Sequence, residues 1–248
     1  CAIKVGYHIR GGLFYYKLLA TLEFQNIKGG VYMFSKFGEI RLEVWAILTV
    51  VVLLSVTGIF FISRKKDILT TSSGNKTRKV VYGGICIALA FVLSYIRLYR
   101  MPQGGSITPA SMLPIIIYSI IFGPVAGITA GIAYGFLQFF QDGSAVHWAQ
   151  LFLDYPLAFG FLGIAGVAPH KINLPSRIIM GTVLAVLGRG LMHVLSGAIF
   201  FYEYAGEQNP WIYSIIYNGT FLSIETVITI VIAIMFSYTQ VYKSIQQP

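Results

Sequence analysis

Residues 211–238 read WIYSIIYNGTFLSIETVITIVIAIMFSY, and this stretch decides the fold. The run is apolar along most of its length, and Glu225 is its single charged residue. About 20 apolar residues are enough for an α-helix to cross the ~30 Å hydrocarbon core of a bilayer. The stretch therefore predicts a membrane-spanning helix.

The composition of the whole chain extends this prediction. Of the 248 residues, 56% are hydrophobic and only 11% are charged, and the mean hydropathy is +0.73. A soluble domain carries about 25% charged residues, so the excess apolar surface here needs lipid to cover it. In lipid only helix bundles and closed barrels pair all their backbone groups. The apolar runs are continuous and lack the alternation of a barrel wall, so we expect an all-α membrane protein.

Polar connectors divide the chain into apolar segments. The first, 44–63, is followed by Arg-Lys-Lys at 64–66 and a polar linker. Six more segments follow, at 80–95, 109–122, 125–140, 149–167, 177–201 and 211–238. Several are short for a bilayer, so some must tilt or be shielded by protein. We predict a six-helix transmembrane bundle plus one extra N-terminal transmembrane helix. The predicted boundaries are an N-terminal segment without assigned structure (1–41), the extra helix (42–66), a cytoplasmic linker (67–78), the six-helix domain (79–240) and a cytoplasmic tail (241–248).

The net charge of +9 comes mainly from basic residues in short connectors. Such residues favour the cytoplasmic side, which places the 64–79 linker inside and the connectors 96–108, 141–148 and 202–210 outside. Arg97 and Arg100 go against this rule. The sequence has no basic stripe with interleaved aromatic residues, which is the pattern that would indicate nucleic-acid binding. We expect a multi-pass protein of the cell membrane, in contact with the lipid bilayer.

Four polar residues inside the predicted helices mark a candidate site, because ionisable or polar groups are costly in a membrane. They are Asp154, His193, Asn218 and Glu225. By the predicted topology the first three fall in the outer half of the membrane. A buried carboxylate beside aromatic faces suits an organic cation. The aromatic residues around these positions are Trp148, Tyr155, Phe200, Phe201, Tyr202, Tyr204, Trp211, Tyr213 and Tyr217. Of these, Trp148 is also expected to be a substrate-binding position.

Each candidate also has a plainer interpretation. Aromatic residues near helix ends often form an interfacial belt. His193 could pack between helices, and Asp154 could be a structural partner of Arg189. Glu225 is expected to be structural or to lie at the pocket edge. The gathering of three polar residues on one side of the membrane favours a binding site.

Motifs of several enzyme classes are absent from the sequence. It has no G-x-x-x-x-G-K-[ST] loop, H-E-x-x-H, C-x-x-C or G-x-S-x-G motif, so we predict no ATPase, metal or catalytic site and no cofactor. Two other classes stay open. One is a secondary transporter or channel that uses Asp154, His193 and Glu225 as a proton relay. The other is a membrane enzyme with His193 as base and Asp154 as its orienting group.

Four motifs carry a resemblance to a known family: MPQGGSI (101–107), LDYPLAF (153–159), GRGLMHVLSG (188–197) and YSIIYNG (213–219). In this order they resemble the thiamine transporter family, ThiT or YuaJ, over about residues 79–240. The family comprises the thiamine-specific S components of energy-coupling factor transporters. The resemblance implies a bundle of S-component type, thiamine as the ligand, and as partners a membrane coupling subunit with two cytoplasmic ATPase subunits. An S component for another vitamin is the nearest alternative.

The resemblance also implies roles for individual residues. Asp154 would engage the thiamine cation and its aminopyrimidine, and Phe201 falls where an aromatic wall, often Trp, is expected. The remaining implied ligand positions are Tyr155, His193, Tyr213 and Asn218, with Gln103, Gly104 and Gly105 in a lid loop. Gly84 and Ala88, four residues apart, suit close contact with the coupling subunit or packing within the bundle.

Overall fold

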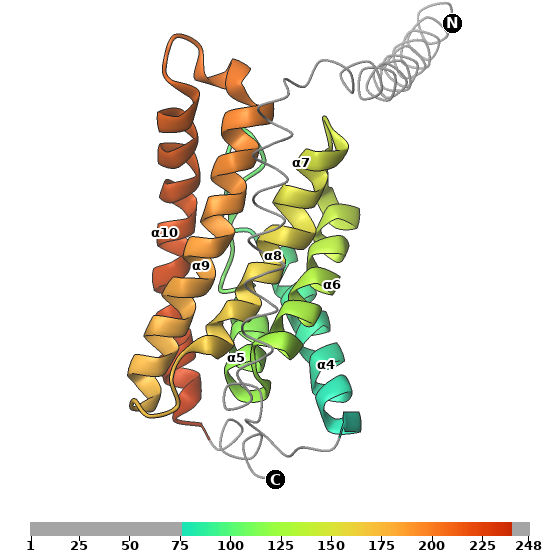
Figure 1. The fold of residues 1–248 in the computed structure, drawn as a ribbon, viewed down its shortest axis with the longest axis vertical. Helices are drawn as coiled ribbons and strands as arrows, with labels where there is room; N and C mark the ends of the chain where they lie inside the picture. The colour runs from blue at the N-terminus through green and yellow to red at the C-terminus, as the bar shows by residue number, and fades with distance from the viewer. Residues whose placement is uncertain (1–75, 240–248) are drawn as a thin grey trace, which may run out of the picture.

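The computed structural model describes residues 76–239, which form a helical bundle (Figure 1). Each of the six segments predicted from residue 80 onward corresponds to a helix or to a continuous run of helical turns. The predicted N-terminal segment, the extra helix at 42–66, most of the linker and the tail at 241–248 lie outside the described residues. The mainly helical, membrane-type fold class is confirmed for the described part of the chain.

The elements follow one another in a simple order. They are α4 (Lys76–Tyr95), the short strands β1 (Tyr99–Arg100) and β2 (Ser106–Ile107), α5 (Leu113–Phe122), α6 (Pro124–Asp142), a composite helix made of α7 (Trp148–Phe152), η2 (Leu153–Leu157), α8 (Ala158–Gly160) and η3 (Phe161–Val167), then α9 (Leu174–Phe200), the turn η4 (Tyr202–Ala205) and α10 (Pro210–Ser237). The strands pair antiparallel, Tyr99 with Ile107 and Arg100 with Ser106, and form a small hairpin between α4 and α5.

Helix α5 occupies the centre of the bundle and is short. Every residue from Pro114 to Phe122 is buried. The predicted start at residue 109 was too early, because Ala110 has a φ of 66°, which a residue with a side chain does not adopt within an α-helix. Four other helical segments are long and apolar enough to cross a membrane: α4, the composite run Trp148–Val167, α9 and α10. Protein, rather than lipid, therefore shields α5.

The outward faces of the long helices are apolar and exposed. Val80 on α4, Leu187 on α9 and Met235 on α10 are 74%, 65% and 67% exposed. A soluble monomer rarely exposes apolar surface of this extent. The bundle therefore presents a surface that suits lipid contact.

Close backbone packing joins α6 to η3. A Cβ atom on Gly163 would overlap main-chain atoms of Gly127 and Ile128. From α5, the Ser119 hydroxyl donates to the Gly163 carbonyl and accepts from the Gly166 N–H at 2.9 Å. These contacts let three elements meet without a layer of side chains between them, as small residues do in membrane bundles.

We expect Gly163→Ala to destabilise the bundle by about 1–3 kcal/mol, the usual cost of overpacking, because main-chain atoms must move to admit the methyl group. Thermal unfolding in detergent measures the effect. Gly84→Ala is the matched control, since a Cβ at Gly84 would meet no described atom within 4 Å. Equal unfolding midpoints for the two variants would contradict this account of the packing.

Candidate functional site

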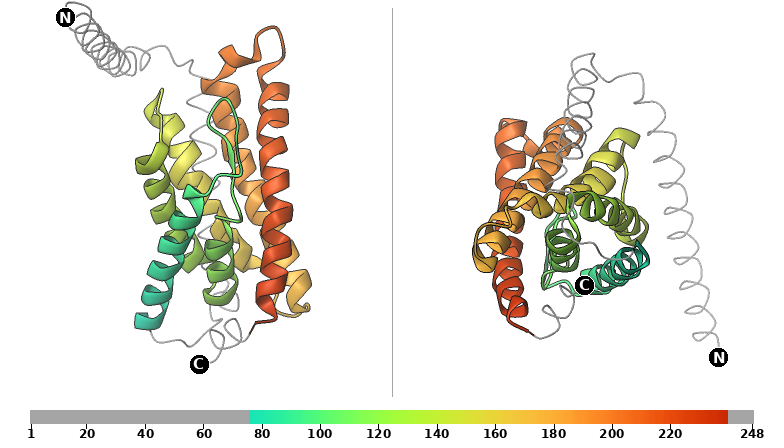
Figure 2. Two further views of the ribbon diagram at one scale, coloured as in Figure 1. Left: turned by 180° about the vertical axis from the view of Figure 1, so that it is seen from behind. Right: turned by 60° about the horizontal axis from the view of Figure 1, so that its bottom comes forward.

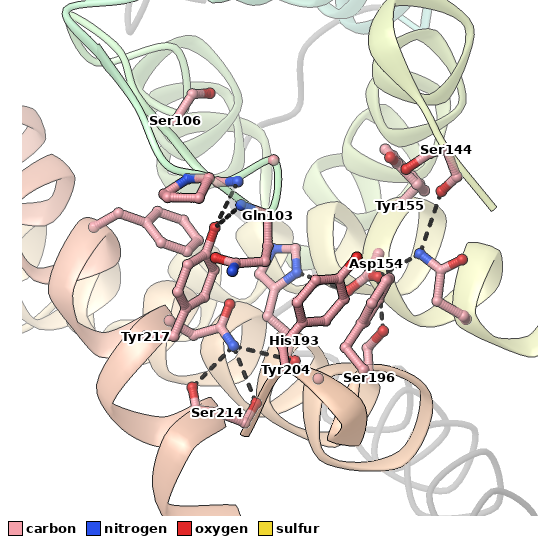
Figure 3. A pocket seen from close by; sticks show the side chains of 18 of the residues that line it. Gln103, Ser106, Ser144, Asp154, Tyr155, His193, Ser196, Tyr204, Ser214 and Tyr217 are labelled. Atoms are coloured by element: carbon pink, nitrogen blue, oxygen red, sulfur yellow. Dashed lines mark hydrogen bonds and ion pairs between the residues drawn. The ribbon is translucent and has the colours of Figure 1, made fainter. Parts of the chain in front are cut away.

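A cavity of about 510 Å³ opens at the end of the bundle where the 96–112 loop meets α6, the composite helix, α9 and α10 (Figure 3). Its lining includes seven of the eight ligand positions expected from the sequence: Gln103, Asp154, Tyr155, His193, Phe201, Tyr213 and Asn218. Trp148 is not among the lining residues. Its indole packs edge-on against Phe152, with ring centroids 6.5 Å apart, and lies beside His147.

Asp154 sits on a widened, π-helical turn of the composite helix. Pro156 has no N–H to continue the α-helical ladder, and the Ala158 N–H instead bonds the Leu153 carbonyl five residues back. Such turns are frequent at functional sites because they re-aim a side chain. Here the turn directs the carboxylate toward α9, while the N-terminal end of α7 is held by His147, whose Nδ1 accepts from the Ala149 N–H at 3.0 Å. Burial lowers the pKa of His147, which favours the neutral ring that this hydrogen bond needs.

Three donors hold the Asp154 carboxylate. Gln150 Nε2 and Ser196 Oγ donate to Oδ2 at 2.6 and 2.7 Å, and His193 Nδ1 lies 3.0 Å from Oδ1. The side chain of Asp154 is 17% exposed, so it keeps access to the cavity. Charge-assisted hydrogen bonds of this kind stabilise an ionised carboxylate away from bulk water.

The tautomer of His193 follows from its neighbours. Arg189 Nε lies 3.2 Å from His193 Nε2, and an arginine can only donate, so Nε2 must be the acceptor. The proton of the neutral ring is then on Nδ1, from which it is donated to Asp154. His193 therefore leaves the negative charge of Asp154 uncompensated.

Glu225, rather than Asp154, pairs with Arg189. Arg189 Nη1 is 3.4 Å from Glu225 Oε2, and the guanidinium also lies 4.5 Å from the centroid of the Phe159 ring. The Glu225 side chain is only 1% exposed. With Asp154 and Glu225 negative, Arg189 positive and His193 neutral, the connected group carries a net charge of −1.

Asn218 adds a directed hydrogen-bonding group on α10. Its Nδ2 donates to the Ser214 carbonyl at 2.9 Å and lies 3.4 Å from the His193 carbonyl. In the described part of the chain no hydrogen bond is recorded to its Oδ1, so this oxygen can accept from a ligand in the cavity.

Aromatic rings form two walls of the cavity. On α10, Tyr213 and Tyr217 stack with an interplanar angle of 18° and centroids 6.2 Å apart. Just after the end of α9, the ring centroids of Phe201 and Tyr204 are 6.1 Å apart. Planar or cationic rings bind well to such faces.

The β1–β2 hairpin covers the cavity and is fastened to α10 (Figure 2, left). The Tyr217 hydroxyl accepts hydrogen bonds from the backbone N–H groups of Gln103 and Gly105, both at 3.2 Å. A Cβ on Gly105 would come within 2.9 Å of the Phe221 ring, so this approach requires glycine. At Gly104 the hairpin turn has a φ of 101°, which also favours glycine.

Sequence reasoning missed several residues that shape the site. Gln150 and Ser196 hold Asp154, and Tyr217 was noted only as one of the surrounding aromatic residues. The helical spacing could have indicated two of them, since Gln150 precedes Asp154 by four residues and Ser196 follows His193 by three. Arg97 and Arg100, which go against the positive-inside rule, also line the cavity.

Comparison with known proteins gives a consistent result. Residues 80–245 match the family described as thiamine transporter protein (Thia_YuaJ). The chain is 36% identical over 149 residues to thiamine transporter ThiT of Bacillus subtilis, covering 55% of this chain and 77% of that protein. It is 26% identical over 167 residues to ThiT of Lacticaseibacillus paracasei, covering 60% and 81%. A solved structure of ThiT from Listeria monocytogenes aligns with a TM-score of 0.57 and 25% identity, covering 66% of this chain and 96% of that chain.

We expect Tyr217→Phe to release the hairpin while leaving the ring stack in place. Losing two hydrogen bonds of about 0.5–1.5 kcal/mol each should speed amide hydrogen exchange in residues 99–107 at least about fivefold. Exchange measured by mass spectrometry on the ligand-free protein tests this. Tyr213→Phe is the control, because Tyr213 stacks on Tyr217 but has no recorded hydrogen bond to the hairpin within the described residues. Equal exchange in the two variants would show that the hydroxyl does not fasten the loop.

Proposed function

Because the chain belongs to the thiamine transporter protein family, we propose that it binds thiamine in this cavity and mediates thiamine uptake as the S component of an energy-coupling factor transporter. It does so as a multi-pass protein of the cell membrane, with the cavity facing outward. The observation that carries the proposal is the pairing of a partly exposed carboxylate, Asp154, with the aromatic walls of the cavity inside a membrane bundle. Thiamine, a monocation built of two linked aromatic rings, matches both properties.

Each part of the ligand has a matching group in the cavity. The Asp154 carboxylate is suited to the aminopyrimidine and to the nearby thiazolium charge. The rings of Phe201 and Tyr213, with Tyr155, are suited to stacking and cation–π contact. Asn218 Oδ1 is suited to an N–H donor of the ligand. The hairpin carrying Gln103 lines the same cavity, and its closure over a bound ligand would exclude water and strengthen the electrostatic contacts.

The secondary-transport alternative is not favoured by the contacts. A proton relay through Asp154, His193 and Glu225 would have to cross Arg189, which lies between His193 and Glu225. Arginine does not give up its proton in proteins, so the chain of groups is interrupted there. Thiamine uptake by vesicles that contain only this chain would reinstate that alternative.

The enzyme alternative is also not favoured. His193 donates from Nδ1 to Asp154 and accepts at Nε2 from Arg189, so neither ring nitrogen is left to activate a nucleophile. Ser196 bonds to the carboxylate rather than to the imidazole. The arrangement therefore lacks the order of a nucleophile, base and orienting acid.

Energy for transport comes, in this proposal, from a membrane coupling subunit and two cytoplasmic ATPase subunits. The sequence has no P-loop of its own. Gly84 and Ala88 are exposed on α4, and a Cβ at Gly84 would meet no described atom within 4 Å. This small-residue strip leaves room for close approach of a partner helix.

Asp154→Asn should lower thiamine affinity at least about 30-fold, since losing the partner of a desolvated charge costs roughly 2–5 kcal/mol. Isothermal titration calorimetry on the detergent-purified chain measures this. Glu207→Gln, at an exposed carboxylate outside the cavity lining, is the matched control and should bind like the wild type. If the folded wild type binds another vitamin in a competition panel but not thiamine, the substrate assignment fails.

Gly84→Leu and Ala88→Leu should retain thiamine binding but abolish uptake when the coupling module is present, because bulk on the exposed strip prevents close docking. Gly219→Leu is the control, as Gly219 is an exposed glycine of α10 that likewise meets no described atom within 4 Å. Uptake assays in cells or in reconstituted vesicles compare the three variants. Normal uptake by both α4 variants would exclude this strip as the docking surface.

A further inference from the structure

We propose that Glu225 is a specificity-determining residue that acts without touching the ligand, by drawing Arg189 away from Asp154 and so reserving the Asp154 charge for a cationic substrate. This inference rests on the proposed function. It concerns a carboxylate that the ligand site itself does not use, since Glu225 is not among the residues that line the cavity.

Of the arginines that line the cavity, Arg97, Arg100 and Arg189, the last belongs to the connected group of Asp154 and would oppose a cationic ligand there. Arg189 lines the cavity, and its Nε is 3.2 Å from His193, the same imidazole that contacts Asp154. An arginine stays protonated under all ordinary conditions. Without Glu225, the guanidinium would pair with Asp154, the carboxylate that lines the cavity, and would compete with a cationic ligand for it.

Glu225 prevents this competition by offering a better-fixed partner. Its carboxylate lies 3.4 Å from Arg189 Nη1, whereas His193 contacts a different nitrogen of the guanidinium, Nε. The hydroxyl of Thr108 donates to Glu225 Oε1, and that of Ser111 lies 3.3 Å from the same oxygen. With these hydroxyls on Oε1 and Arg189 on Oε2, both carboxylate oxygens are engaged, so the side chain holds one orientation.

Within the connected group of Asp154, His193, Arg189 and Glu225, the charge count favours a cationic ligand. Glu225 cancels Arg189, His193 is neutral, and Asp154 supplies the remaining −1. Replacing Glu225 by an uncharged residue changes the net charge of the group from −1 to 0. It also frees Arg189 to turn toward Asp154.

The decisive experiment compares two ligands of the same shape. One is thiamine, and the other is its isostere in which an uncharged thiophene ring replaces the thiazolium. Glu225→Gln should weaken thiamine binding by about 30-fold, the effect of one charge at roughly 8 Å with an effective dielectric constant of about 20. The affinity for the neutral isostere should fall less than that for thiamine, because the isostere loses its Asp154 contact to the aminopyrimidine but carries no positive charge. Calorimetric titration of both ligands gives the ratio of the two affinities.

The double variant Arg189→Gln/Glu225→Gln should return this ratio to within about threefold of the wild-type value, because it restores the net charge of −1. It leaves no buried charge without a partner, so it keeps the proposal testable if Glu225→Gln alone does not fold. Glu207→Gln serves as the control for loss of a carboxylate elsewhere.

Three outcomes would overturn the proposal. Equal weakening of both ligands by Glu225→Gln would mean that Glu225 has only a structural role. Unchanged affinity for both would mean that it has no role in binding. If the ratio of the two affinities in the double variant stays as low as in Glu225→Gln, the Arg189–Glu225 pair acts through contact rather than through charge. If the folded wild type binds neither ligand, the thiamine assignment itself fails, which is a distinct result.

Discussion

The site depends on an ionised carboxylate, Asp154, held inside a bundle whose outer surface is apolar. A charge in such surroundings is expensive unless hydrogen bonds and a counter-charge accompany it. Gln150 and Ser196 donate to it directly, and His193 links it to the Arg189 pair. These contacts join the composite helix, α9 and α10 at one level of the bundle. The polar group therefore fixes the relative positions of helices whose apolar faces alone would allow sliding.

The same physical cost made part of the site predictable from the sequence. A polar residue in an apolar run signals function because its burial costs several kcal/mol, and this rule works on one residue at a time. It selected Asp154, His193, Asn218 and Glu225; the first three line the cavity, and Glu225 does not. Segment positions were predictable for a similar reason, since the length of an apolar run is a local property. The start of α5 could not be predicted, because the positive φ of Ala110 has no local sequence signal.

Partner choice could not be predicted, because it depends on how helices cross. The sequence analysis named Asp154 as an alternative structural partner of Arg189 and named no partner for Glu225, whereas the structure pairs Arg189 with Glu225. The π-helical turn at Pro156 and the register of α10 against α9 decide the outcome, and neither follows from composition. Trp148 shows the same limit. It precedes Asp154 by six residues, and its indole packs beside His147 instead of lining the cavity.

The shortness of α5 explains why there is a cavity at all. A helix of 10 residues rises about 15 Å, half of a ~30 Å membrane core, so the centre of the bundle is filled by helix over only part of its height. Figure 1 shows α5 toward the end of the bundle opposite the α9–α10 connector. The loop with the hairpin of β1 and β2, and not a helix, lines the cavity of about 510 Å³ at the other end of the bundle. Non-helical backbone is tolerated at this depth only where protein surrounds it or it lines a cavity, and both conditions hold here.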